Sequence, residues 1–209
     1  AFKKILHEMY SSFRTLRALK IITSLSSFSG YFMAIKDYLQ PVLQIYATAL
    51  PVLLFLNQKK REALIIGVVY FILYFISSRA SKYSGKSADR FSNILKPLNL
   101  TLILGLITGV LAGAFLKFNI AIVSIVLFIG IHIIENLRRP MAVSYASETF
   151  SDKILASVLS VESQAKSLIA AIFAVLLGFF ADYISIEFSF IITSLILLFT
   201  IPLFLLRKK

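Results

Sequence analysis

The stretch from residue 97 to 116, PLNLTLILGLITGVLAGAFL, runs for twenty residues without a charge and has a lysine at either end. A helix of this length spans roughly 30 Å, which is the thickness of the hydrocarbon core of a bilayer. Gly105, Gly109 and Gly113 recur at every fourth position, so they share one helix face that a neighbouring backbone can approach closely. We therefore predict a transmembrane helix that packs through its glycines against its own bundle, with dimerisation through the same face as the alternative.

The composition of the whole chain is that of a membrane protein. Hydrophobic residues make up 58% of it and the mean hydropathy is +0.86, whereas a soluble domain has roughly 45–50% apolar residues. The net charge is +12, but the basic residues lie between apolar runs, as in cytoplasmic loops of membrane proteins. We expect the lipid bilayer, and no nucleic acid, as a partner. Without cysteine and with two histidines, the chain is expected to hold no metal or cofactor.

Six apolar stretches are long enough to cross a membrane, at about 20–38, 62–78, 97–116, 119–137, 156–180 and 187–206. Before them, residues 1–19 combine apolar residues at helical spacing with a basic side, which predicts an amphipathic helix on the cytoplasmic membrane surface. The predicted fold is an all-α membrane protein, with a six-helix transmembrane domain over 20–206 between this surface helix and a basic tail, 207–209. Because the chain begins with a charged stretch and not with Met, we expect it to come from the middle of a longer polypeptide.

The apolar stretch 42–56 could be a seventh span, but it is short and contains Pro51. Charge decides between the two topologies. With six spans, 16 basic residues fall on the side of both termini and 5 on the other, which is the asymmetry of a protein with both termini in the cytoplasm. A seventh span would move the basic cluster around Arg79 to the outside. We therefore predict that 42–56 extends the first helix and continues as an interfacial segment on the outer face.

Polar residues near the outer end of the first span are candidates for a solute site. Lys36, Gln40 and Gln44 share one helix face, and Asp37 lies on the adjoining face. They either line a cavity and contact the solute or belong to a helix end that is already in water. Tyr70 and Tyr74 are four residues apart in the second span. Their hydroxyls could also bind a solute, or simply accompany apolar rings that pack against neighbours.

The fourth span carries His132, Glu135, Asn136 and Arg139 on one side. Ionisable groups in a span are costly and therefore suggest a function. His132 and Asn136 are candidates for solute binding, and Glu135 with His132 for proton coupling, because histidine titrates near neutrality. The alternative is a structural ion pair between Glu135 and Arg139 at the inner end of the helix.

The fifth span carries Glu162 and Lys166, four residues apart in the orientation that favours a helical ion pair. We expect these two residues to neutralise each other near the inner interface, with Arg139 of the fourth span close by. They could instead line an inner gate together with Gln164.

Several strings in the chain resemble those of the C-terminal half of a major facilitator superfamily transporter. The Arg139-Pro140 pair resembles the end of that family's tenth helix, LASVLS at 155–160 the start of its eleventh, and GFFAD at 178–182 the end of the eleventh. SRASKYSGK at 78–86 lies where the family has a basic loop between its eighth and ninth helices. Their order and spacing cover nearly the whole chain.

The resemblance implies twelve helices in two halves, so the N-terminal six-helix half of the same transporter is an expected partner. It also implies that the first, second, fourth and fifth spans line the solute cavity. The sequence shows no phosphate-binding loop and no nucleophile elbow, and we expect no enzyme activity. The expected function is transport of a small solute by alternating access in a bacterial cytoplasmic membrane. A non-transporting receptor or scaffold bundle of the same fold is the alternative.

Overall fold

The computed structural model describes residues 16–49 and 55–206, and within these ranges the chain forms helices joined by short connections. In chain order the elements are α2 (Leu16–Ile35), the 3-10 turn η1 (Lys36–Tyr38), α3 (Leu39–Ala49), α4 (Gln58–Ala88), α5 (Leu95–Lys117), α6 (Ala121–Thr149), α7 (Asp152–Tyr183) and α8 (Ile186–Phe204). Within these described ranges, six helical segments are long and apolar enough to cross a membrane, which confirms the predicted all-α fold and the number of candidate spans. The expected surface helix and basic tail lie outside the described residues, except for 16–19, which begin α2.

The first span is a composite of α2, η1 and α3, and its apolar helix runs from Ala18 to Tyr46. The expected continuation of the first helix past residue 42 is therefore observed as far as Ala49. The 3-10 turn has a local cause. Pro41 lacks an N–H, so the carbonyl of Asp37 has no donor four residues ahead, and the helix tightens there.

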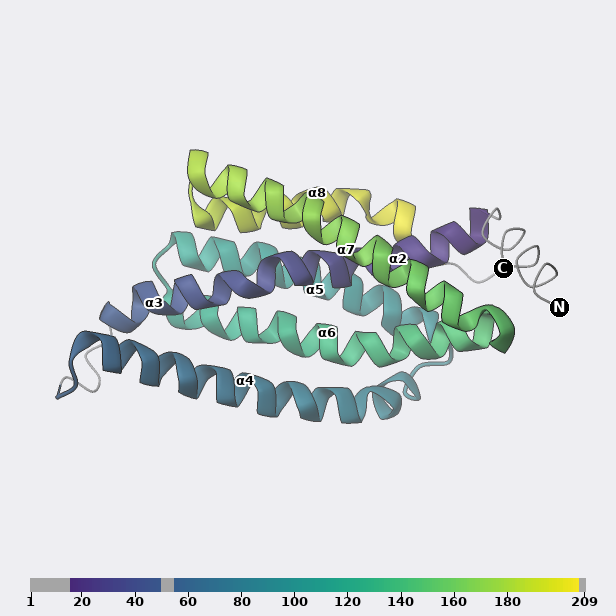
Figure 1. Ribbon diagram of the computed structural model, residues 1–209, viewed down its shortest axis with the longest axis horizontal. Helices are drawn as coiled ribbons and strands as arrows, with labels where there is room; N and C mark the ends of the chain where they lie inside the picture. The colour runs from purple at the N-terminus through teal and green to yellow at the C-terminus, as the bar shows by residue number, and fades with distance from the viewer. Residues whose placement is uncertain (1–15, 50–54, 207–209) are drawn as a thin grey trace.

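The helices lie side by side along the long axis of the molecule (Figure 1). The α4–α5 and α6–α7 connections lie at the end where α2 begins, and the α5–α6 and α7–α8 connections lie at the opposite end. Successive spans therefore run in alternating directions, as a six-span membrane domain requires. Near the α2 end, Asn99 of α5 exchanges two hydrogen bonds with the backbone of Leu206, of 2.8 and 3.1 Å, and so ties the end of α8 to α5.

The glycine row of α5 packs inside the bundle. A Cβ at Gly105 would overlap the ring of Phe28, and one at Gly109 would overlap the hydroxyl of Tyr31, both from α2. A Cβ at Gly113 would lie 2.7 Å from the carbonyl oxygen of Glu187 in α8. The prediction that these glycines serve close packing within the bundle is confirmed. Their face is covered by α2 and α8, so it is not available to a second copy of the chain.

Burial is uneven among the spans. In their most apolar stretches, 72% of the residues of the first span are buried, but only 17% of those in α4 and in α7. Large apolar side chains on both helices are open, for example Phe71 on α4 and Val175 on α7, which are 72% and 73% exposed. These two helices therefore present most of their surface to lipid or to another membrane segment.

The topology can be tested with two single cysteines, because the chain has none of its own. Lys59 and Gly85 lie near opposite ends of α4, about 39 Å apart along the helix axis. A side chain added at Gly85 meets no atom within 4 Å, and Lys59 is exposed. We expect an impermeant thiol reagent to label Gly85→Cys only from the cytoplasmic side and Lys59→Cys only from the outside. Labelling of both from one side would contradict the six-span arrangement.

Candidate functional site

A pocket of about 400 Å³ lies between the first span, α4 and α6. Counted over their whole helical lengths, the first span, α4 and α6 have their middle residues at Phe32, Leu73 and Glu135. Phe32 and Leu73 themselves line the pocket, and the α6 residues that line it flank Glu135 on either side. We call it the midplane pocket, and its walls are Phe32, Lys36, Leu73, Tyr74, Ser77, Ser78, His132 and Asn136.

Two of the polar atoms on this wall, His132 Nε2 and Ser77 Oγ, are buried and have no hydrogen-bond partner among the described residues. His132 is 7% exposed and Ser77 5%. The imidazole ring is held edge-on against Phe32, with the ring centroids 4.8 Å apart. Buried polar groups are normally hydrogen-bonded, and more so where no bulk water is near. These two atoms therefore point to an occupant of the pocket, either water or a solute, that completes their hydrogen bonds.

The structure brings four of the predicted solute-binding residues to this pocket, namely Lys36, Tyr74, His132 and Asn136. Asn136 is oriented by its own helix, because its amide donates to the carbonyl of His132 at 2.9 Å. Lys36 lies in η1 and pairs with Asp37, with 3.1 Å between Nζ and Oδ1. The 3-10 turn η1 thus places the Lys36 side chain on the pocket wall.

The other predicted solute-binding residues lie away from the pocket wall. Asp37 has a side chain that is 79% exposed, and Gln40 and Gln44 are exposed further along α3. Tyr70 packs against Tyr74, with 6.0 Å between the ring centroids, and does not line the pocket. Of the polar residues predicted near the outer end of the first span, only Lys36 therefore reaches the pocket.

A second, smaller pocket of about 170 Å³ lies between α2, α6 and α7. We call it the inner pocket, because its residues lie on the parts of these helices nearer the start of α2. Its polar lining is Ser29, Arg139, Glu162, Ser163 and Lys166. The three residues predicted for a gate, Arg139, Glu162 and Lys166, are therefore brought together here.

The expected ion pairs are not formed around the inner pocket. Within the part of the chain that the structure describes, no contact under 4.0 Å joins Glu162 to Lys166, or Glu135 to Arg139. Glu162 and Lys166 both line the cavity. An ion pair between two such residues on a solvated helix face stabilises the helix by at most about 0.5 kcal/mol. Spacing along the helix allowed this pair but did not require it.

The buried arginine beside Glu135 is Arg138, which is not among the site residues predicted from the sequence. Arg138 is 1% exposed and Glu135 4%, whereas Arg139 is exposed. The Arg138 Nη2 group donates to the carbonyl of Ser24 in α2 at 2.9 Å, while its Nε and Nη1 and the Glu135 Oε2 have no hydrogen-bond partner. A signal was present in the sequence, because Phe128, Ile131, Glu135, Arg138 and Met141 follow one another at spacings of three and four. Arg138 therefore belongs to the packed stripe of α6.

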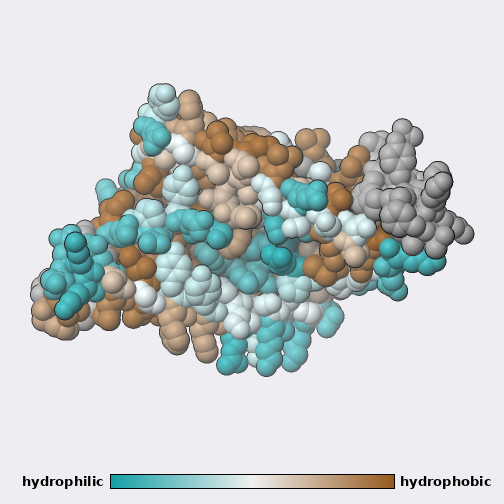
Figure 2. Space-filling view, in the orientation of Figure 1, coloured by the Kyte–Doolittle hydropathy of each residue, from teal (hydrophilic) through white to brown (hydrophobic). Residues whose placement is uncertain are grey.

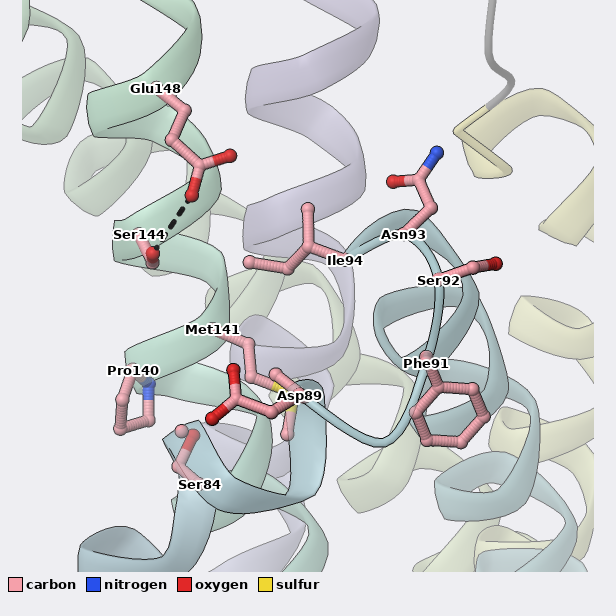
Figure 3. Close-up of a pocket in the computed structure, with 12 residues that line it drawn as sticks. Ser84, Asp89, Phe91, Ser92, Asn93, Ile94, Pro140, Met141, Ser144 and Glu148 are labelled. Carbon is pink, nitrogen blue, oxygen red and sulfur yellow. Dashed lines mark hydrogen bonds between the residues drawn. The ribbon is translucent and has the colours of Figure 1, made fainter.

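A larger pocket, of about 710 Å³, lies at the cytoplasmic end predicted from the charge asymmetry, between the α4–α5 connection and α6 (Figure 3). Asp89 and Glu148 lie on its rim, and Ser144 donates to Glu148 at 3.4 Å. Both carboxylates are exposed. None of its lining atoms is buried without a partner among the described residues. This hollow is larger than the midplane pocket, but its polar groups do not require an occupant.

The midplane pocket offers hydroxyl, imidazole, amide and ammonium groups beside two aromatic rings, which suits reversible binding of a small polar molecule. Among the described residues, no three histidine or carboxylate side chains gather as a metal site would need. No protein-family model matches the sequence, and no curated protein matches it.

Proposed function

We propose that the chain forms the C-terminal half of a secondary transporter, which moves a small solute across a bacterial cytoplasmic membrane by alternating access. The observation that supports this most is the midplane pocket. Three spanning helices contribute to it near their middle residues, and two buried polar atoms on its wall lack a partner. A binding site near the middle of the membrane, between helices that can rock, is the general arrangement of secondary transporters.

The surface of the bundle supports a partner in the membrane. Figure 2 shows hydrophilic side chains across the middle of the face formed by α2, α4, α6 and α7, between hydrophobic patches. Polar side chains within membrane-spanning helices are unfavourable in contact with lipid. The apolar surfaces of α4 and α7, which are the least buried spans, flank that polar middle. A second helical bundle seated on this face, such as the N-terminal half implied by the resemblance, would cover the polar groups and enclose the pocket.

A receptor or scaffold bundle of the same fold is the second candidate, and one observation favours it. Glu135 and Arg138, the most deeply buried charges of α6, face a packing contact with α2 and do not line the midplane pocket. Buried charges that only hold helices together are expected in a bundle that binds no solute as well. The two candidates differ in whether the midplane pocket opens to both sides of the membrane.

Sidedness of access can be measured at Ser78, which lines the pocket and is exposed. In the full-length protein, we expect Ser78→Cys to react with an impermeant thiol reagent in both right-side-out and inside-out vesicles, because alternating access opens one site to each side in turn. Lys59→Cys and Gly85→Cys serve as markers of the two faces. Reaction of Ser78→Cys from one side only, with the markers intact, would favour the receptor or scaffold.

A further inference from the structure

We infer that the midplane pocket selects small organic anions, a proposal that rests on the proposed transport function. Carboxylates with a compact planar or apolar body are the class that fits best. The inference comes from the charges on the pocket wall, from its hydrogen-bonding groups and from its aromatic sides.

The wall carries a positive charge and no carboxylate. Of its eight residues, Lys36 is the one with a basic side chain that carries a formal charge, and neither Asp nor Glu is among them. Asp37, which pairs with Lys36, has a side chain 79% exposed and does not line the pocket. The Lys36 side chain is 40% exposed, so its ammonium can keep Asp37 as a neighbour and still approach a solute. At a partly exposed site like this one, the ammonium favours an anion over a cation of the same size by a modest free energy.

The unpartnered groups also suit an anion. An ionised carboxylate only accepts hydrogen bonds, and it needs several donors around it. The Ser77 hydroxyl can donate to it, and so can His132 when Nε2 carries the proton. Lys36 contributes a charged donor on the same wall. A cationic solute would find one charge of its own sign there.

The size and the sides of the pocket limit the rest of the solute. A volume of about 400 Å³ lies at the small end of ligand pockets, which hold roughly 300–1,000 Å³. Phe32 and Tyr74 present aromatic rings on two of the helices that form it. These rings can pack against a planar or apolar body while the polar groups hold the anionic end.

The charge preference can be measured without knowing the solute. Ser78→Cys places a thiol on the pocket wall of a cysteine-free chain. The rates of its reaction with anionic sulfonatoethyl and cationic trimethylammonioethyl methanethiosulfonate would be compared in detergent, relative to the same pair of rates for 2-mercaptoethanol. We expect the anionic reagent to be favoured by about fivefold or more.

Three variants test whether the preference for the anionic reagent comes from the pocket or from the net charge of the chain. Lys36→Met in the Ser78→Cys background should abolish or reverse the preference, because Asp37 then has no counter-charge. Lys166→Met removes one charge of the same sign from a half-buried lysine in the inner pocket, and should change the ratio by less than about twofold. Asp37→Asn should raise the anionic preference, and as an exposed site it remains informative if Lys36→Met does not fold.

A ratio no higher than that of 2-mercaptoethanol, or one that Lys36→Met and Asp37→Asn leave unchanged, would overturn the anion assignment. The outcome is separate from that of the sidedness experiment. Reaction from one side only, combined with a preference that depends on Lys36, would refute transport and leave an anion site. Access from both sides without a charge preference would support transport and refute the solute class.

Discussion

Replacing Gly109 with leucine should strongly destabilise the bundle. At this position α2, α5 and α8 meet, because a Cβ would overlap the Tyr31 hydroxyl and would lie 2.6 Å from the Ser194 Oγ. Overpacking of a well-packed core costs about 1–3 kcal/mol of stability. To make room for the leucine here, both α2 and α8 would have to move away from α5. We expect a loss near or above the upper end of this range, measured as a fall in melting temperature on the order of 5–10 °C in detergent.

The hydrogen bonds at this junction hold the Tyr31 and Ser194 side chains in place, so these side chains cannot easily move aside. Ser194 donates its hydroxyl proton to the carbonyl of Phe190 at 2.6 Å. The Tyr31 hydroxyl, 2.6 Å from Ser194 Oγ, must then be the donor of that bond. Tyr31 is fully buried, so a leucine that displaces its ring would leave two buried hydroxyl groups without good geometry.

Gly67→Leu is the matched control for Gly109→Leu. It makes the same exchange inside α4, at a position where an added Cβ meets no atom within 4 Å. We expect its melting temperature to stay at or slightly above that of the wild type, since leucine has the better helix propensity. Equal losses in both variants would mean that the glycine row of α5 is not specially packed.

The spans could be predicted from the sequence, but their helical lengths could not. The second span was expected over 62–78 and α4 extends from Gln58 to Ala88; the fourth was expected over 119–137 and α6 extends to Thr149. Apolar runs mark the part of a helix that suits hydrocarbon. Backbone hydrogen bonding continues beyond it into water, and an N-cap such as Asn57, whose side chain accepts from the Lys60 amide at 3.0 Å, determines where the helix begins.

The candidate site could be predicted in part, because helical spacing shows which residues of one helix share a side. It placed His132, Glu135, Asn136 and Arg139 together on α6. It did not show which neighbour each would meet. In the structure His132 and Asn136 line the midplane pocket, to which α4 also contributes. Arg139 lines the inner pocket, to which α7 also contributes. Glu135 is buried, as is Arg138. Adjacent arginines on a helix point about 100° apart, so the rotation of α6 in the bundle decides which of them is buried.

Glu135→Gln is the second substitution for which we expect a large effect. It removes the carboxylate that acts most strongly on the buried Arg138 guanidinium and leaves Glu162 as the weaker one, and arginine cannot shed its charge. No contact under 4.0 Å joins Glu135 to Arg138 among the described residues, so we expect a cost at or somewhat below the lower end of the about 3–5 kcal/mol that breaking a buried charge pair costs. Arg138→Met should cost less, because a carboxylate left alone can be neutralised by binding a proton. The measurement is the unfolding free energy of each variant in detergent.

The double variant Glu135→Gln/Arg138→Met separates a structural charge pair from two independent sites. If the two charges compensate each other across the turn of α6, the double variant should be more stable than Glu135→Gln alone, because no net charge remains buried. Arg139→Met is the control. It removes the adjacent but exposed arginine, and its effect should stay within about 0.5 kcal/mol.

The same variants test whether Glu135 carries a proton during transport. A Glu135→Gln protein that keeps wild-type stability but loses uptake driven by a pH gradient, while still exchanging solute, would contradict the structural role and support proton coupling. The geometry favours the structural role. Glu135 is 4% exposed and does not line the midplane pocket, and the neighbouring Arg138 holds the carbonyl of Ser24 in α2. We therefore expect stability to fall before coupling can be measured, and the loss to be recovered in the double variant, where a proton carrier would show no recovery.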